Sequence, residues 1–346
     1  CFYTDVAHNR AAYSLGRMTE DTLETLVRRA MRYADRQVSF VFQGGEPTLA
    51  GAAFYETLIR LQKEYNTRGL WIQNAIQTNG YALDEELIEL FAREHFLVGV
   101  SLDGDPQTHD LMRRDAAGNG TAAAVERTIG RLQDRGVEFN ILCVVNRYVA
   151  QHPAETFRAL RRYQFLQYIA CLDPLDGAES DYSLTPDAYA AFLTESFDLY
   201  WRAWKEGNPV SIRNFDNYLS ILAGKQPENC AMSGRCAQYY LVEADGSVYP
   251  CDFYVLDSWR MGNVNQSSFF QLEKSPVSER FRQEALQLAG DCRQCEWYGL
   301  CRGGCRRDRE PFVQGQMAKN KWCGSYQALF RHAAPRMRQM AQALFQ

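Results

Sequence analysis

The chain has 346 residues, of which 46% are hydrophobic and 23% charged, so it can form about two folded domains and is neither disordered nor collagen-like. With 38 basic and 42 acidic side chains, its net charge of −4 provides no positive field for nucleic acid or an anionic membrane, and we expect a small or peptidic partner. No apolar run approaches a transmembrane length and no basic-then-apolar leader opens the chain, so we expect a cytoplasmic protein.

Strand and helix alternate from Thr19 to Pro174. Thr19 begins an amphipathic helix with apolar residues at helical spacing, and a short strand follows at 38–42. Further helices are expected at 54–65, 83–94, 122–135 and 154–163, and further strands at 71–76, 96–100, 138–146 and 165–172. Regular alternation predicts a parallel sheet, open or closed into a barrel, with its functional site where the strands end.

Three of these strands run directly into polar loops that contain glycine. The loop at 43–47 reads Gln-Gly-Gly-Glu-Pro; its glycines let the backbone approach a ligand closely, and Glu46 offers a carboxylate to a cationic group. The loops at 77–80 and 101–104 read Gln-Thr-Asn-Gly and Ser-Leu-Asp-Gly, and each alone is typical of an ordinary turn. Their shared position at strand ends favours one common ligand site.

The alternation stops after an aromatic-rich helix from Thr185 to about Trp204, which Glu-Gly-Asn-Pro at 206–209 ends. Beyond it, two short strands around an Asp-Gly turn are expected to form a hairpin that delivers Cys251 and Asp252. We therefore divide the chain into a first domain at 1–206, a linker at 207–229, a cysteine-rich domain at 230–323 and a C-terminal helix at 324–346.

Eight of the 11 cysteines lie in the cysteine-rich segment, enough for two sites of four thiolates each. A disulfide framework would instead suit a small secreted domain without a core. Cys-x2-Cys on a tight loop suits both tetrahedral zinc and an iron–sulfur cluster, so the spacing leaves the metal open. The eight are Cys230, Cys236, Cys251, Cys292, Cys295, Cys301, Cys305 and Cys323, whereas Cys143 and Cys171 lie in apolar runs and are expected in the core.

Arginines at 302, 306, 307 and 309 lie close to two of these cysteines. Four arginines on one loop usually form a solvated or ion-paired face, and the negative net charge argues against nucleic acid. We therefore expect a solvated or ion-paired face here.

The loops and the cysteine pattern together resemble a radical S-adenosylmethionine enzyme with a SPASM extension. More narrowly, the segments at 42–51, 140–146 and 249–254 resemble the anaerobic sulfatase-maturating enzymes. They read Phe-Gln-Gly-Gly-Glu-Pro-Thr-Leu-Ala-Gly, Asn-Ile-Leu-Cys-Val-Val-Asn and Tyr-Pro-Cys-Asp-Phe-Tyr. The resemblance covers nearly the whole chain.

This resemblance implies an α/β fold: a partial (β/α)6 TIM-like barrel, followed by a cysteine-rich SPASM iron–sulfur domain and a C-terminal helix. It implies a radical-generating [4Fe–4S] cluster, S-adenosylmethionine and two auxiliary [4Fe–4S] clusters as cofactors. In such enzymes a 5′-deoxyadenosyl radical abstracts a Cβ hydrogen from a cysteine or serine of an unfolded or nascent sulfatase, and the product is Cα-formylglycine. The implied partners are that sulfatase polypeptide and an electron donor such as flavodoxin or ferredoxin, and we expect a monomer.

Site residues are carried over by position. Those implied for the cofactor are Gly44, Gly45, Glu46, Ser101 and Leu172, with Asp103 and Arg113 as further candidates. Arg113 is included because its fixed cation could meet the methionine carboxylate, while the three loop residues at 44–46 would hold the methionine amino group. Asp252 matches the family's proposed base, and Gln43 and Tyr3 match substrate-pocket positions.

The resemblance also implies how the cysteines divide between the auxiliary clusters. Cys230, Cys236, Cys251 and Cys305 would ligate the first, and Cys292, Cys295, Cys301 and Cys323 the second. The two sets interleave along the chain.

The start of the sequence departs from the family pattern. The hallmark is Cys-x3-Cys-x2-Cys followed by Phe-Tyr, and this sequence begins at Cys1-Phe2-Tyr3, so Cys1 is the only one of those three ligands present. We expect that the chain is truncated, because the downstream site positions are intact; otherwise it is catalytically inactive.

Two alternative functions remain open. The same barrel and SPASM clusters serve radical enzymes that form thioether or carbon–carbon crosslinks in peptides. A more distant alternative is a non-enzymatic module in which the eight cysteines bind two zinc ions.

Overall fold

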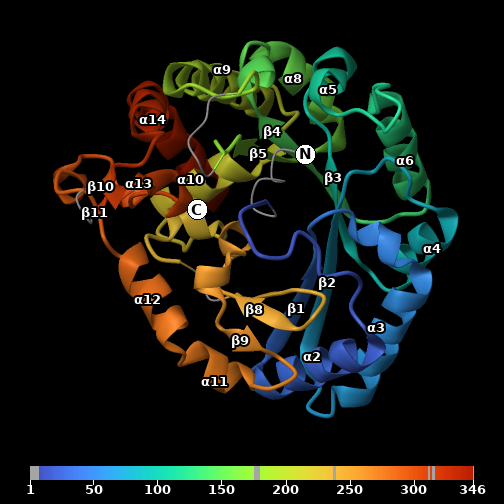
Figure 1. Cartoon of the computed structure of the whole chain (residues 1–346). Helices are drawn as coiled ribbons and strands as arrows, with labels where there is room; N and C mark the ends of the chain where they lie inside the picture. Colours follow the sequence, from blue (N-terminus) through green and yellow to red (C-terminus); the bar gives the residue numbers. More distant parts are fainter. Residues whose placement is uncertain (1–7, 175–179, 237–238, 311, 314–315, 346) are drawn as a thin grey trace.

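The computed structural model describes residues 8–174, 180–236, 239–310, 312–313 and 316–345 (Figure 1). Its largest element is a six-stranded parallel sheet in which each strand pairs with the next along the chain. The strands are β1 (Gln37–Phe42), β2 (Trp71–Thr78), β3 (Leu97–Ser101), β4 (Phe139–Val145), β5 (Phe165–Ala170) and β6 (Ser211–Ile212). Because β1 and β6 are the two ends of this order, the sheet is an open barrel, which agrees with the predicted partial (β/α)6 fold.

Helices connect these strands and surround the sheet (Figure 1). They are α2 (Glu20–Tyr33), α3 (Ala52–Tyr65), α4 (Glu85–Arg93), α5 (Pro106–Met112), α6 (Ala122–Asp134), α7 (Arg147–Ala150), α8 (Pro153–Leu160) and α9 (Pro186–Lys205). Polar side chains cap the first turns of several of these helices. Thr19 Oγ1 accepts a hydrogen bond from the Thr22 amide of α2 (3.3 Å), and Asp84 Oδ1 accepts one from the Leu87 amide of α4 (2.8 Å).

Alternate side chains of β1 point to opposite faces of the sheet. The Phe42 ring packs on Phe54 and Tyr55 of α3, with ring centroids 6.0 and 5.2 Å away, whereas Val41 on the other face is 60% exposed. Tyr55 is fully buried, and its hydroxyl donates a hydrogen bond to the Pro47 carbonyl (2.7 Å). This packing holds the loop after β1 against α3.

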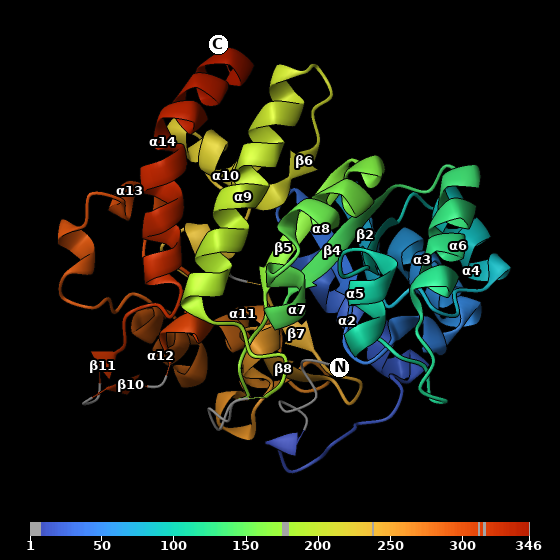
Figure 2. The same cartoon turned by 90° about the horizontal axis from the view of Figure 1, so that it is seen from above.

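The second part of the chain consists of short elements around a small antiparallel sheet. That sheet comprises β7 (Leu241–Val242), β8 (Ser247–Tyr249) and β9 (Gly262–Asn263), and β10 (Phe312–Val313) pairs separately with β11 (Gln316–Met317). The helices are α10 (Arg213–Leu222), α11 (Phe269–Glu273), α12 (Pro276–Ala285), α13 (Tyr298–Cys301) and α14 (Cys323–Phe345). Figure 2 shows α14 running beside α9, on which it packs.

The segment 207–229, expected to be a linker, contains β6 and α10 instead. Its apolar side chains explain the difference, because Phe215, Tyr218 and Leu219 are buried and α10 packs against α14. One continuous cluster of buried residues joins the barrel to the cysteine-rich part. Among the described residues, no helix is long and apolar enough to cross a membrane.

Candidate active site

The loops that follow β1 and β2 meet at the Glu46 carboxylate. Glu46 Oε1 accepts hydrogen bonds from the Thr48 amide (3.2 Å), the Thr48 hydroxyl (2.7 Å) and the Thr78 hydroxyl (2.8 Å), and Oε2 accepts one from the Asn79 amide (2.8 Å). A carboxylate offers about four acceptor positions, so these contacts fix its orientation. Gly44 and Gly45 adopt φ angles of +84° and +51°, a region that side-chain-bearing residues rarely adopt.

The end of β3 is hydrogen-bonded to β2 through side chains. Gln77 Nε2 donates a hydrogen bond to Ser101 Oγ (3.1 Å). A Cβ atom on Gly99 would lie 2.1 Å from Gln77 Oε1, so glycine at this position makes room for the glutamine. Gly99 was not among the predicted site residues, although a glycine in the middle of a strand often marks such a close approach and is the signal that could have identified it.

Asp103 and Arg113 form a partly buried ion pair. Arg113 Nε lies 2.5 Å from Asp103 Oδ2, and the Val144 amide donates to Asp103 Oδ1 (2.8 Å). Asp103 is only 1% exposed, and a buried carboxylate needs such partners. This arrangement indicates that Asp103 orients the Arg113 side chain and does not itself contact the ligand. Leu172, two residues after the end of β5, is half-buried.

Asp252 lies between the barrel and the hairpin of the cysteine-rich part. Gln43 Nε2, at the end of β1, donates to Asp252 Oδ2 (3.2 Å), so the predicted base and one predicted substrate-pocket residue are brought together. On the other side, the Tyr239 hydroxyl donates to Asp252 Oδ1 (2.5 Å) and lies 3.2 Å from Cys251 Sγ. Tyr239 belongs to no recognisable motif, so the sequence gives no signal for a role at this site. Tyr3 and Cys1 lie outside the described residues.

The eight cysteines of the second part are free thiols that gather in two groups. Cys305 interacts electrostatically with Cys251 and Cys230, and Cys236 also with Cys230. Cys301 interacts with Cys323, Cys292 and Cys295, which form the other group. Each group draws its members from one of the two implied sets, and which thiols ligate which cluster stays a prediction.

Four thiols per group match the ligand number of a four-iron cluster. In a four-iron cluster each iron is ligated by one cysteine thiolate, so the four ligand sulfurs surround the cage from outside. Burial raises the pKa of Cys236 and of Cys301 to about 11, so cluster binding must displace their protons.

The arginines near Cys305 differ in part from the expected solvated face. Arg306 and Arg309 are 1% and 4% exposed. The Arg306 guanidinium pairs with Glu284 (2.6 Å) and lies over the rings of Tyr254 and Phe281. The ion-paired interpretation therefore holds for Arg306, but the solvated one is wrong for both residues. Aromatic rings cover Arg306, and the Arg309 guanidinium donates hydrogen bonds to the carbonyls of Ala285 and Gln287.

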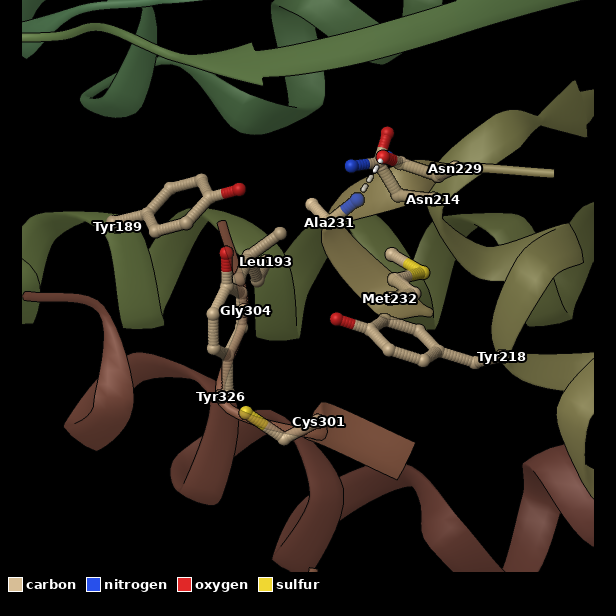
Figure 3. A pocket seen from close by; sticks show the side chains of 10 residues that line it. All are labelled: Tyr189, Leu193, Asn214, Tyr218, Asn229, Ala231, Met232, Cys301, Gly304 and Tyr326. Carbon is tan, nitrogen blue, oxygen red and sulfur yellow. Dashed lines mark hydrogen bonds between the residues drawn. The ribbon is translucent and has the colours of Figure 1, made fainter. Parts of the chain in front are cut away.

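A small cavity lies between α9, α10 and the cysteine-rich part (Figure 3). Its volume is about 50 Å³, and the side chains of Tyr189, Tyr218 and Tyr326 point into it. A larger cavity of about 290 Å³ lies near Phe165, at the start of β5 and thus at the opposite end of the strand from the loops. The first has room for water only, and neither adjoins Glu46 or Asp252.

Two protein-family models match the chain: the Radical SAM superfamily over residues 1–160, and SPASM, an iron–sulfur cluster-binding domain, over residues 230–296. A cysteine-type anaerobic sulfatase-maturating enzyme of Clostridium perfringens (strain 13 / Type A) is 42% identical over 97% of this chain and 92% of its own length. The cysteine-type enzyme of Clostridium novyi is 41% identical over 99% of this chain and 93% of its own length. The serine-type enzyme of Bacteroides thetaiotaomicron is 28% identical over 99% of this chain and 87% of its own length.

A solved structure of the same family is also similar to this chain. Native anSMEcpe with bound AdoMet and Kp18Cys peptide superposes with a TM-score of 0.93 at 41% identity, over 95% of this chain and 92% of that one. Together with the sheet and the thiol groups, these matches define a radical SAM enzyme with a SPASM domain, whose cofactors are S-adenosylmethionine and [4Fe–4S] clusters. The predicted fold class and cofactors are thus confirmed. The chain belongs to the anaerobic sulfatase-maturating enzymes.

Proposed function

We propose that this protein oxidises a cysteine of a sulfatase polypeptide to Cα-formylglycine. The observation that carries the choice of cysteine over serine is the difference in identity between the two kinds of relative. Cysteine-type enzymes are 41–42% identical to this chain over nearly its whole length, whereas serine-type enzymes are 28–29% identical. The anSMEcpe structure with a bound peptide supports a peptide as the substrate.

The chain's own residues have three tasks in this reaction. When bound, the radical-generating cluster and S-adenosylmethionine supply a 5′-deoxyadenosyl radical that removes a hydrogen atom from the target Cβ. Gly44, Gly45 and Glu46 would hold the methionine amino group, while Ser101, Leu172 and Arg113 would line the rest of the cofactor. The two glycines leave open space beside the backbone there, which supports a close approach of the cofactor.

Asp252 would take the proton from the substrate thiol as the carbon radical gives up one electron, which an iron–sulfur cluster would accept. The resulting thioaldehyde would then be hydrolysed by water to the aldehyde, with release of hydrogen sulfide. The hydrogen bonds of Asp252 to Gln43 and Tyr239 hold the carboxylate between the barrel and the cysteine-rich part, which supports its role as the base. A thiol gives up its proton far more readily than a serine hydroxyl, so a single carboxylate is a sufficient base for cysteine. Cys230, Cys236, Cys251 and Cys305 would hold one auxiliary cluster, and Cys292, Cys295, Cys301 and Cys323 the other.

We further propose that a flavodoxin or ferredoxin supplies the electrons and that the protein acts as a monomer. The free thiols favour a reducing compartment, which supports a cytoplasmic reaction. Crosslink formation in a small peptide is the alternative radical reaction. Streptococcus suis SuiB bound to S-adenosylmethionine has a TM-score of 0.60 at 12% identity, a likeness of fold alone.

The experiment that tests this function compares two peptides that differ in one residue. The anaerobically reconstituted holoenzyme is incubated with S-adenosylmethionine, a strong reductant and a peptide containing Cys-x-Pro-x-Arg or Ser-x-Pro-x-Arg. We expect mass spectrometry to show replacement of the cysteine sulfur by an aldehyde oxygen, with slower conversion of the serine peptide. Cleavage of S-adenosylmethionine without an aldehyde in either peptide would contradict the proposal and favour a crosslinking enzyme.

A further inference from the structure

Tyr239 lies where the proposed base meets a proposed cluster ligand. Its hydroxyl oxygen is 2.5 Å from Asp252 Oδ1 and 3.2 Å from Cys251 Sγ. Asp252 Oδ1 and Cys251 Sγ are themselves 3.2 Å apart, so the three atoms form a closed triangle. The second carboxylate oxygen is held separately by Gln43.

When a cluster is bound, the three groups differ in whether they have a proton to donate to a hydrogen bond. A cysteine that ligates iron is a thiolate and has no proton to donate. An ionised Asp252 has none either, so two acceptors of like charge would face each other at hydrogen-bonding distance. Among these three groups, the Tyr239 hydroxyl then has the one proton that can offset their repulsion.

We propose that Tyr239 is a positioning residue whose hydroxyl is shared between Asp252 and the Cys251 sulfur, holding the base against the first auxiliary cluster. Two effects follow from one contact. The carboxylate is fixed between Gln43 and Tyr239, and the cluster sulfur gains a hydrogen-bond donor. Hydrogen bonds to cluster sulfurs are among the factors that set cluster reduction potentials, and a donor raises them. This inference rests on the proposed function for the role of Asp252.

The next residue in the chain provides a matched control. Tyr240 Oη lies 3.2 Å from Tyr33 Oη, and its ring packs on Phe269 with the centroids 5.0 Å apart. Its hydroxyl is therefore engaged with α2 and not with Asp252 or Cys251. Tyr240→Phe removes the same atom as Tyr239→Phe, one residue away, without touching the triangle.

The deciding experiment is a potentiometric titration of both variants and the parent holoenzyme, followed by electron paramagnetic resonance. We expect Tyr239→Phe to move one auxiliary-cluster transition to a lower potential, and Tyr240→Phe to move none. Potentials in Tyr239→Phe that equal those of the parent would overturn the contact with the sulfur. The readout needs no peptide turnover, so it decides this inference even where the Cys-x-Pro-x-Arg peptide is not converted.

Peptide conversion supplies the second readout. We expect Tyr239→Phe to lower kcat for the Cys-x-Pro-x-Arg peptide by about 10- to 100-fold with little change in KM, since the residue orients the base and does not bind peptide. Tyr240→Phe should keep the parent kcat. A raised KM at unchanged kcat in Tyr239→Phe would overturn the positioning role. Conversion by neither the parent nor the variants would contradict the proposed function, while the potentials still decide the sulfur contact.

Discussion

Asp252 is held by hydrogen bonds from two parts of the chain that are far apart in sequence. Gln43 belongs to the barrel and Tyr239 to the segment before β7, so the carboxylate is oriented on both oxygens. Such a group can act as a base at a defined place instead of sampling many rotamers.

Replacing Asp252 with asparagine keeps the shape and removes the base. We expect Asp252→Asn to lower formylglycine formation by about 10²- to 10⁴-fold while 5′-deoxyadenosine is still formed, because radical generation does not need this proton transfer. The ratio of aldehyde to 5′-deoxyadenosine, measured by mass spectrometry, tests this. Asp35→Asn, at a side chain that is 95% exposed, is the control. An unchanged ratio in Asp252→Asn would exclude it as the base.

His109 provides a pH-dependent test of the loop after β3. It is fully buried; Nδ1 accepts from the Asp103 amide (3.1 Å), and Nε2 lies 3.0 Å from Thr121 Oγ1. Burial lowers its pKa, so the folded state favours neutral His109. Below about pH 6.5, the ordinary histidine pKa, the unfolded chain takes up a proton that the folded chain resists, and the free energy of unfolding falls; above that pH this effect is absent.

We therefore expect the melting temperature of the parent to fall more steeply between pH 7.5 and about pH 5.5 than that of His109→Gln. Glutamine keeps one donor and one acceptor but cannot take up the proton. His152→Gln, at an exposed histidine, should retain the parent slope. Equal slopes for the parent and His109→Gln would show that His109 does not contribute to the pH dependence.

At the scale of elements, helices and strands that depend on local sequence were predicted correctly, whereas elements that depend on contacts with distant segments were not. The strand expected at 38–42 is β1 at Gln37–Phe42, and the helix expected from Thr185 is α9 at Pro186–Lys205, because apolar period and capping residues act locally. The segment with β6 and α10 was misjudged as a linker, since its two-residue strand depends on pairing with β5 and on burial of Ile212, both of which are set by distant parts of the chain. Tyr239 was missed for the same reason: its partners are set by the fold.

The loop around Arg306 shows how burial can reverse an expectation from composition. The guanidinium lies 4.9 Å from the Tyr254 ring centroid and 4.6 Å from those of Trp259 and Phe281, and it pairs with Glu284. Planar stacking and paired hydrogen bonding are properties of arginine that lysine lacks. The residue therefore connects the loop after Cys305 to α12.

We expect Arg306→Ala to lower the free energy of unfolding by about 3 kcal/mol, because it leaves partly buried carboxylates without their cation. Arg306→Lys should recover part of this loss through its charge. Thermal unfolding of the two variants beside Arg338→Ala, an exposed arginine of α14, measures the effect. A melting temperature of Arg306→Ala equal to that of the parent would mean that the aromatic side chains alone hold the loop.

At the scale of the whole molecule, the cysteine-rich part contacts the barrel at two distant places. Asn265 Nδ2 donates to Thr22 Oγ1 of α2 (3.3 Å), and the Arg307 guanidinium donates to the Asp173 carbonyl after β5 (3.1 Å). Lys321 also pairs with the Asp173 carboxylate. Between them, Asp252 accepts a hydrogen bond from Gln43, the residue that follows β1.

Iron content and stability are therefore expected to change together. The two auxiliary clusters account for about eight iron atoms per chain, and binding them contributes directly to folding. We expect anaerobic iron and sulfide analysis to find them, and chelation to lower the melting temperature. Zinc in place of iron would contradict the cluster assignment, and an unchanged melting temperature after iron removal would show that the apolar core alone sustains the fold.

The continuous core also limits how members of this family can exchange segments. A domain that is joined by a flexible linker can be exchanged for another, because it makes few contacts with the neighbouring domain. Here α14, at the end of the chain, packs along α9, and its buried Leu329, Phe330 and Ala333 belong to the common core. A recombination point at residue 206 would separate these two faces, so a viable chimaera should inherit α9 through α14 as a single block.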